Sequence, residues 1–299
     1  MKNSLCLNNR SFYHAYKGAF IIINKIANMD RRIVFLLIAI AVIIPLVKPF
    51  GLHISTSKPV ENIYNYVEKL PKGSVIWVGI DYYNSTTTEC NPIAMSFLRH
   101  AFSKGHKVFV TSSIPDGNVI SLNIVNKIAK EYDKEYGKDY VILGYKPGAM
   151  VLIKQVCDNI RSLYPTDIYG TNIDELPMMA KVNDSKNINM VFTSTDNATF
   201  DEYVKVASTQ YHIPVAGGST GVSVPMLYTF LNSGQIMGLV GGLKGAAEYE
   251  TLISHPDTAT AGMDAQSCVH LTIVILILFS NFAYFVNKFS GPEKENGQE

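Results

Sequence analysis

The sequence predicts an α/β protein built on a small, doubly wound, mainly parallel sheet of five strands, Rossmann-like and flanked by a transmembrane helix at each end. Three observations predict it. Short β-branched runs alternate with stretches of helical pattern, which is typical of a parallel sheet built from right-handed crossovers. The runs are continuously apolar, as expected for strands covered on both faces. One apolar segment precedes this alternating region and another follows it.

Breaker residues bound each expected element. A helix over residues 60–70 ends at Pro71 and Gly73, and a long excursion over residues 164–185 carries Gly170 and Pro177. The expected strands are residues 74–80, 107–112, 139–145, 188–194 and 213–217, and the helices between them are 92–103, 118–136, 147–163 and 200–211. We expect the strand order 3-2-1-4-5, which places a ligand site beyond the carboxyl ends of the strands.

The first apolar segment, residues 33–47, has no charge until Lys48 and predicts a transmembrane helix over residues 33–52. A cleaved signal peptide is the alternative, because such a signal also places an apolar core behind a basic region. No Ala-x-Ala-like site follows, and the basic leader of residues 1–32 is longer than usual for a signal peptide. We therefore expect an uncleaved anchor.

The second apolar segment predicts a transmembrane helix over residues 269–287, after an α/β domain of residues 59–268. A buried core helix is the alternative. Tyr284 and Lys288 form an interfacial end, and the polar tail of residues 288–299 follows directly, which favours a membrane span.

Charges beside these segments predict the orientation in the cell membrane. Before the first segment stand six basic residues against the single acid Asp30: Lys2, Arg10, Lys17, Lys25, Arg31 and Arg32. The positive-inside rule then keeps the amino terminus in the cytoplasm, and an even number of spans returns the carboxyl tail to the same side. The α/β domain is expected outside the cytoplasm, and the loss of one span would reverse this.

Composition excludes several functions. Hydrophobic residues make up 47% of the chain, charged residues 17%, and the net charge is +1, which gives no case for nucleic-acid binding. The four cysteines form no C-x-x-C pair and the histidines show no metal-ligand spacing, so we expect no metal and no cofactor. A disulfide between Cys90 and Cys157 and a pair of buried free thiols both remain open.

Polar residues at the expected strand ends are the candidate site. Asp81 and Glu89 could form a carboxylate pair for acid/base catalysis, although Asp81 as a turn cap and Glu89 near a helix start is the plainer interpretation. The candidate ligand-binding residues are Ser112, Lys146, Ser194, Asp196, Gly217, Gly218, Ser219 and Thr220. Ser112 and Ser113 lack a G-x-S-x-G motif, so capping serines are favoured over a nucleophile.

The turn Gly217-Gly218-Ser219-Thr220-Gly221 suggests a site for an anionic small molecule. Glycines permit close backbone approach, and a following helix start would offer free N–H groups to a phosphate or carboxylate. The turn lacks both the G-x-G-x-x-G and the G-x-x-x-x-G-K-[ST] spacing. A flexible turn in which Ser219 or Thr220 caps a helix is the favoured alternative.

A second glycine-rich segment, residues 236–254, predicts a helix with little side-chain bulk. Gly238, Gly241, Gly242 and Gly245 are spaced so that another element can approach closely. Packing on the sheet is favoured over an interface between protomers, and Lys244 argues against a third membrane span.

Five phrases resemble a family of uncharacterised prokaryotic membrane proteins with two spans and an α/β domain between them. The phrases are RRIVFLLIAIAVIIP, EYGKDYVILGYKPG, YPTDIYGTNIDELPMM, SGQIMGLVGGLKGAAEYE and GMDAQS. The resemblance implies the same layout of anchor, domain and anchor. It implies no activity and no catalytic residue, and the first 29 residues are longer than the leader associated with that family.

These observations favour a non-enzymatic membrane component: an anchored domain that binds a ligand or partner and assembles with copies of itself or with neighbouring membrane proteins. The alternative is a membrane-bound hydrolase or transferase that acts on an anionic small molecule or an envelope precursor through Asp81, Glu89 and the glycine-rich turn. A transporter subunit is disfavoured, because the two apolar segments carry no intramembrane charge that would mark a path.

Overall fold

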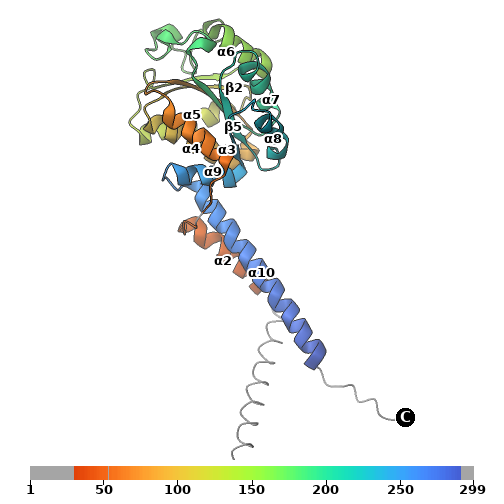
Figure 1. Ribbon diagram of the computed structural model, residues 1–299. Helices are drawn as coiled ribbons and strands as arrows, with labels where there is room; N and C mark the ends of the chain where they lie inside the picture. The colour runs from red at the N-terminus through yellow and green to blue at the C-terminus, as the bar shows by residue number, and fades with distance from the viewer. Residues whose placement is uncertain (1–29, 53, 291–299) are drawn as a thin grey trace, which may run out of the picture. The chain divides into compact units, whose positions relative to one another are not determined.

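The computed structural model describes residues 30–52 and 54–290 (Figure 1). It divides into two compact units. Residues 51–263 form an α/β unit, and the other unit contains the helix α2 (Arg31–Val47) and the greater part of the helix α10 (Thr258–Ser290).

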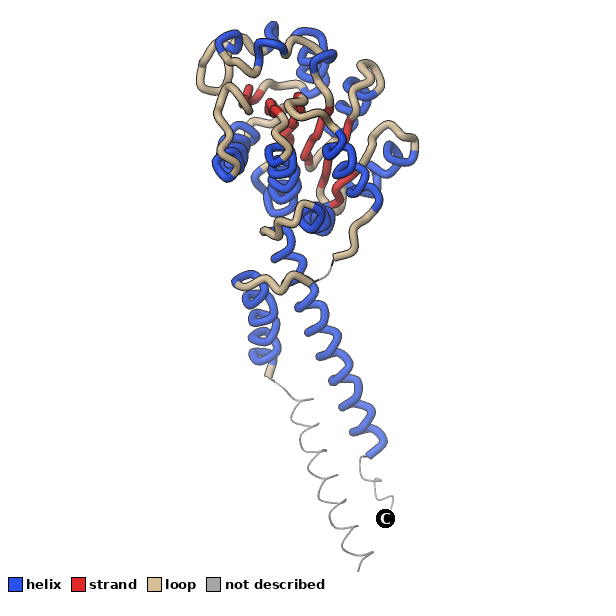
Figure 2. Tube along the Cα trace, turned by 60° about the vertical axis from the view of Figure 1, so that its left-hand side comes forward, coloured by secondary structure: helices blue, strands red, loops and turns tan. Residues whose placement is uncertain are grey.

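The α/β unit is built on a sheet of six parallel strands in the order β3-β2-β1-β4-β5-β6 (Figure 2). The strands are β1 (Val75–Asp81), β2 (Lys107–Ser112), β3 (Tyr140–Tyr145), β4 (Met190–Thr195), β5 (Val215–Ser219) and β6 (Leu239–Gly241). The α/β class is therefore confirmed, and the first five strands have the predicted order. The chain reverses its direction of travel across the sheet between β1 and β4, which defines the topological switch point.

The sixth strand corrects the sequence interpretation of the second glycine-rich segment. Gly238 precedes β6 and Gly241 ends it, so neither lies in a helix, while Gly242 and Gly245 belong to the helix α9 (Gly242–Leu252). The strands β5 and β6 pair in parallel, with Gly217 opposite Leu239 and Gly218 opposite Val240. Glycine is unfavourable inside both helices and strands, so the glycines do not select either structure. The segment forms a strand because β5 offers it an edge of unpaired backbone N–H and C=O groups.

Helices cover both faces of the sheet, as Figure 1 shows. One face packs against α3 (Lys58–Lys69), α4 (Thr87–Ser103), α5 (Gly117–Glu131) and α9; the other packs against α6 (Ala149–Leu163), α7 (Thr199–Tyr203) and α8 (Val224–Asn232). Phe97 of α4 stacks on Phe192 of β4, with 3.7 Å between ring centroids, in the first core. Trp77 of β1 anchors the second core, where it meets Tyr203 edge to face and donates to the Thr111 hydroxyl.

Three helices differ from the sequence prediction. The helix expected over residues 118–136 ends at Glu131, and the one expected over 200–211 is the short α7 followed by a π-helical turn, Val204–Ser208. The helix α8 was expected only as a helix start after the glycine-rich turn, capped by Ser219 or Thr220, with no bounds, and it begins later, at Val224. It begins next to Pro225, which favours a first helical turn, and it ends before Gly234, whose φ is +73°.

Carboxylates of α9 hold the segments where the α/β unit begins and ends. Glu248 accepts hydrogen bonds from the backbone N–H and hydroxyl of Ser57, just before α3. Glu250 accepts from the backbone N–H groups of Ala259 and Thr260, in the first turn of α10, and both carboxylates are buried. Glu250 therefore caps a helix terminus from a neighbouring helix, where negative charge is favourable.

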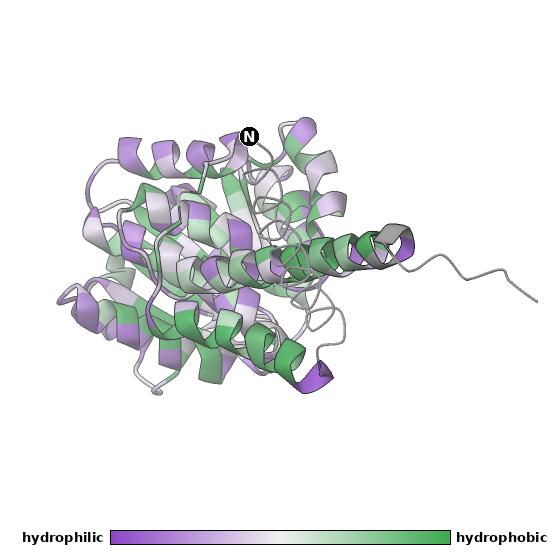
Figure 3. Ribbon diagram, turned by 90° about the horizontal axis from the view of Figure 1, so that it is seen from below, coloured by the Kyte–Doolittle hydropathy of each residue, from purple (hydrophilic) through white to green (hydrophobic). Residues whose placement is uncertain are grey.

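One helix of the described chain, α10, is long and apolar enough to cross a membrane, over Thr258–Val286. It runs through the predicted second span, residues 269–287, and begins well before it. The helix α2, at the predicted first span, does not reach that length: it has 17 residues, contains Pro45 and gives way to extended backbone at Lys48, which makes it about 26 Å long. Apolar residues line both helices (Figure 3).

Candidate functional site

The carboxyl edge of the sheet, where β1 to β5 end, gathers most of the predicted site residues. Loops cross this edge after each strand, and the loop after β1 lies at the switch point between β1 and β4. In an open α/β sheet this is where a ligand is expected. The edge also carries residues that the sequence analysis did not select.

Asp81, at the end of β1, is fully buried. Its carboxylate accepts hydrogen bonds from the backbone N–H of Ser113 at 2.6 Å, from the Ser113 hydroxyl at 2.7 Å and from the Tyr203 hydroxyl at 3.0 Å. Burial raises the pKa of the Asp81 carboxyl, while the hydrogen bonds from Ser113 and Tyr203 act in the opposite direction. Asp81 therefore ties the loop after β2 and the helix α7 to the central strand.

Glu89, in the first turn of α4, serves a different loop. Its carboxylate accepts the backbone N–H of Gly221 at 2.8 Å, beyond the end of β5. Asp81 and Glu89 share no hydrogen-bond partner in the described chain, so the geometry gives no support to an acid/base pair. The plainer interpretation of both residues, as anchors of turns and helix starts, fits these contacts.

Two further carboxylates hold the loop after β1 from both sides. Asp196, which the sequence analysis selected, accepts the backbone N–H of Tyr83 at 3.0 Å and the Thr86 hydroxyl at 2.6 Å. Asp116, which it missed, accepts the backbone N–H of Asn84 at 2.9 Å. The signal that could have found Asp116 is its position in a Pro-Asp-Gly turn directly after a predicted strand.

The three candidate serines are buried in the strands rather than presented to solvent. The hydroxyls of Ser112, Ser194 and Ser219 donate to the backbone carbonyls of Ile80, Cys90 and Thr195 respectively. Ser112 and Ser219 thus each join their strand to a neighbouring strand, and Ser194 joins β4 to the helix α4. None of the three hydroxyls caps a helix through these bonds. Lys146 is half-buried, and its ammonium lies 5.5 Å from the centre of the Tyr164 ring.

The glycine-rich turn is also used by the fold itself. Gly217 and Gly218 lie inside β5, where an added Cβ at Gly218 would meet the Ile93 side chain at 2.5 Å. Thr220 is buried, and its carbonyl accepts the N–H groups of Ser223 and Val224 at the start of α8. The Gly221 N–H is taken by Glu89, so these groups are not available to an anion.

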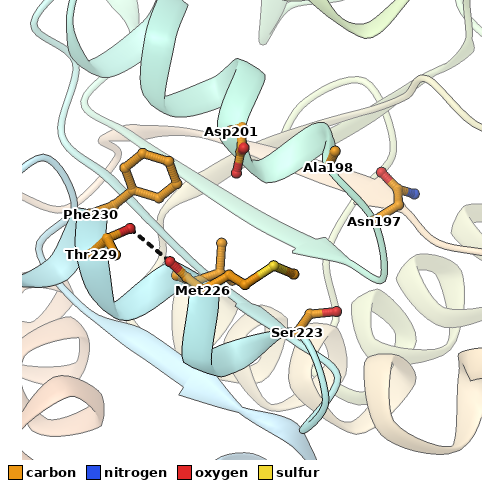
Figure 4. Close-up of a pocket in the computed structure, with 8 residues that line it drawn as sticks. Asn197, Ala198, Asp201, Ser223, Met226, Thr229 and Phe230 are labelled. Carbon is orange, nitrogen blue, oxygen red and sulfur yellow. Dashed lines mark hydrogen bonds between the residues drawn. The ribbon is translucent and has the colours of Figure 1, made fainter.

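A cavity of about 430 Å³ lies beside these residues, between the loop after β4 and the helix α8 (Figure 4). Its lining consists of Asn197, Ala198, Asp201, Ser223, Met226, Leu227, Thr229 and Phe230. This volume lies in the range of small-molecule sites. None of the predicted site residues lines the cavity, although Asp196 directly precedes the lining residue Asn197. The lining residues of α8 were not selected because the sequence analysis set no bounds for a helix after the glycine-rich turn.

No group of three or more His, Cys, Asp or Glu residues is placed to hold a metal ion within residues 30–52 and 54–290. The disulfide considered between Cys90 and Cys157 is absent, and both cysteines are buried free thiols in different cores, on opposite faces of the sheet. Burial raises the pKa of both thiols to about 12, so neither is a reactive thiolate at neutral pH.

The fold and the site define an α/β protein of Rossmann-like type with a small cavity at the carboxyl edge of its sheet. No family model matches the chain, and no curated protein matches it either. One solved structure that it matches is described as the "Glycotransferase of kitacinnamycin", with 15% sequence identity and a TM-score of 0.25. The match covers 68% of this chain and 45% of that chain, so it spans less than half of that protein. A similarity this low carries no inference about activity.

Proposed function

We propose that this protein is a membrane-anchored binding component whose α/β domain takes a small ligand, or a side chain of a partner, at the carboxyl edge of its sheet. The observation that carries the proposal is the cavity of about 430 Å³ between the loop after β4 and the helix α8. It lies on the β4 and β5 side of the switch point, near the carboxyl edge at which open α/β sheets bind their ligands.

The partners of the carboxylates at this edge support binding rather than catalysis. Asp81, Glu89, Asp116 and Asp196 each accept a backbone N–H from a loop that they hold in place. A general base must reach the proton that it abstracts, and the buried Asp81 has no exposed surface from which to do so. An anionic substrate would also meet Glu89 at the turn where it was expected to bind.

The proposed membrane anchor is α10. Its apolar side chains are largely exposed, and in a membrane they would be covered by lipid. We propose α2 as a second, shorter anchor. Phe35, Leu36 and Val47 of α2 are each more than half exposed, and a bilayer adapts to a short helix by local thinning. The basic pair Arg31 and Arg32 keeps its amino-terminal end in the cytoplasm, which places the α/β domain outside and leaves it free to assemble with copies or neighbours.

Phenethyl alcohol, an uncharged aromatic probe, tests the binding function in the full chain reconstituted in lipid nanodiscs. The reporter is the ¹³C-labelled methyl group of Met226, assigned with Met226→Leu. We expect a saturable shift of this methyl signal and no shift of Met190, which is buried within the sheet. Filling the cavity with Ala198→Trp removes the shift, whereas Lys138→Trp, on an exposed turn before β3, preserves it. An unresponsive Met226, or an Ala198→Trp variant that behaves like the wild type, contradicts the proposal.

A further inference from the structure

The cavity has an apolar body that suits an aliphatic or aromatic group. Met226, Leu227 and Phe230 line it from α8, and Ala198 lines it from the start of α7. Met226 is 69% exposed although it borders the cavity, so its flexible thioether side chain is free to adapt to a ligand. Phe230 offers an aromatic face, which attracts cations as well as apolar groups.

Only some hydrogen-bonding groups of the polar lining residues are free to bind a ligand. Asn197 is committed: its amide nitrogen donates to the Asp81 carbonyl and to Asp196, and its oxygen accepts from the N–H and hydroxyl of Thr199. The Thr229 hydroxyl donates to the Met226 carbonyl, which leaves its oxygen lone pairs free to accept. The Ser223 hydroxyl accepts from the Thr220 hydroxyl at 3.2 Å, so its own proton is the one hydroxyl donor that the described lining keeps free. Beside this donor, the lining offers a ligand hydrogen-bond acceptors.

Asp201 is the strongest of these acceptors. Its carboxylate has no hydrogen-bond or ion-pair partner in the described part of the chain, and Figure 4 shows it directed into the space between α7 and α8. The nearest candidate partner in sequence, Lys205, is paired with Glu202 at 3.3 Å. No lysine, arginine or histidine lines the cavity. An unpaired carboxylate beside apolar surface favours a positively charged ligand.

The start of α8 does not counter this preference with free donors. The Val224 N–H is bonded to the Thr220 carbonyl, Pro225 has no N–H, and the Met226 N–H is bonded to the Ser223 carbonyl. An anion would therefore find no free N–H at these three positions. Glu89, Asp116 and Asp196 add negative charge along the same edge of the sheet.

We propose that the cavity binds a small organic cation, with its apolar or aromatic body against Met226, Leu227 and Phe230 and its ammonium group donating to the Asp201 carboxylate. This assignment rests on the proposed function, because it names the ligand class of the same cavity. It also reverses the charge that the glycine-rich turn suggested from sequence.

Phenethylamine, which is protonated at neutral pH, tests the charge against phenethyl alcohol, which has the same ring and chain. Both are titrated into the full chain in nanodiscs and followed at the Met226 methyl. We expect the amine to bind about fivefold more tightly, a modest factor because Asp201 is partly solvated. Asp201→Asn brings the affinity for the amine to within about twofold of that for the alcohol and leaves the alcohol unchanged.

Glu175→Gln is the control, because it removes an exposed carboxylate that does not line the cavity and leaves the pairing of Lys205 with Glu202 intact, and it is expected to preserve the preference for the amine. Equal affinities for amine and alcohol, with no effect of Asp201→Asn, would overturn the cation assignment and leave the binding function standing. If neither probe shifts Met226, both proposals fail.

Discussion

His100 shows what burial does to a single titratable side chain in this protein. It lies in α4 and is 2% exposed, with Nδ1 2.9 Å from the Tyr249 hydroxyl and Nε2 3.0 Å from the Glu68 carboxylate. A neutral ring satisfies both partners when Nε2 carries the proton and Nδ1 accepts from Tyr249, a tautomer inferred from the contacts. Burial lowers the pKa of His100 to about 4, against the opposing effect of Glu68.

This pKa predicts that acid destabilises the α/β domain. Unfolded histidine titrates near 6.5, so between about pH 6.5 and pH 4 the unfolded state binds more protons than the folded state, and stability falls as the pH falls. The contribution lost is about 3 kcal/mol, from about 2.5 pKa units at 1.36 kcal/mol each. Urea unfolding followed by the fluorescence of Trp77, the single tryptophan, measures it in the full chain.

His100→Gln removes this part of the pH dependence, so the stability gap between the wild type and the variant narrows as the pH falls from 7.5 to 4.5. His212→Asn, on an exposed turn, keeps the wild-type profile and serves as control. Parallel profiles for the wild type and His100→Gln would show that His100 does not titrate as described.

For single residues, the sequence predicts a position at a strand end but not the contacts of the side chain. The position of Asp81 and Ser112 at strand ends follows from strand boundaries, which local pattern reveals. Whether such a side chain faces solvent or bonds to the next strand depends on the loops that cover it. The loops follow β2, β4 and β5, and these strands are far apart in sequence. The burial of Ser112, Ser194 and Ser219 was therefore not predictable.

At the scale of the elements, β5 and the turn after it contain two kinds of glycine. Gly218, in β5, is closely packed against its neighbours, whereas Gly221, in the turn, has space around it. An added Cβ at Gly218 would meet Ile93 at 2.5 Å and the Val240 carbonyl at 2.8 Å, because β6 and α4 pack directly on this strand. At Gly221 the nearest atom, on Glu89, is 3.5 Å away. We therefore expect Gly218→Ala to lower the free energy of unfolding by about 1–3 kcal/mol.

Gly221→Ala is the matched control and should change the free energy of unfolding by no more than about 0.5 kcal/mol. Both variants are compared with the wild type by urea unfolding at Trp77. If Gly218→Ala were as stable as Gly221→Ala, β5 would not be as closely packed as the structure has it.

Element order was predictable where the pattern is strong and local. The five β-branched runs and their intervening helices gave the order of β1 to β5, since right-handed crossovers leave few alternatives. The strand β6 was missed because Gly238 and Gly241 weaken any periodicity, and its pairing with β5 is a tertiary effect. The bounds of the short α8, Val224–Asn232, were not predicted for a related reason: nine residues give little helical period to detect.

On the scale of the whole molecule, the chain combines a folded α/β unit with apolar helices that water cannot cover favourably. The buried carboxylates Glu248 and Glu250 fix the first and last segments of the α/β unit to the same helix, α9. The unit is thus closed on itself, with its own two cores. If α10 crosses a membrane as proposed, the side on which the α/β unit lies depends on whether α2 crosses it as well.

Cysteine labelling decides that side. In a chain with Cys6 and Cys268 replaced by serine, the remaining Cys90 and Cys157 are buried and unreactive, so a single Lys138→Cys reports on the exposed turn before β3. With two spanning helices and the basic flank in the cytoplasm, we expect a membrane-impermeant maleimide to label Lys138→Cys in intact spheroplasts. A Gln298→Cys reporter in the carboxyl tail should react only after the membrane is permeabilised. Protection of Lys138→Cys until the membrane is permeabilised would place the domain, with its cavity, in the cytoplasm and contradict the proposed orientation.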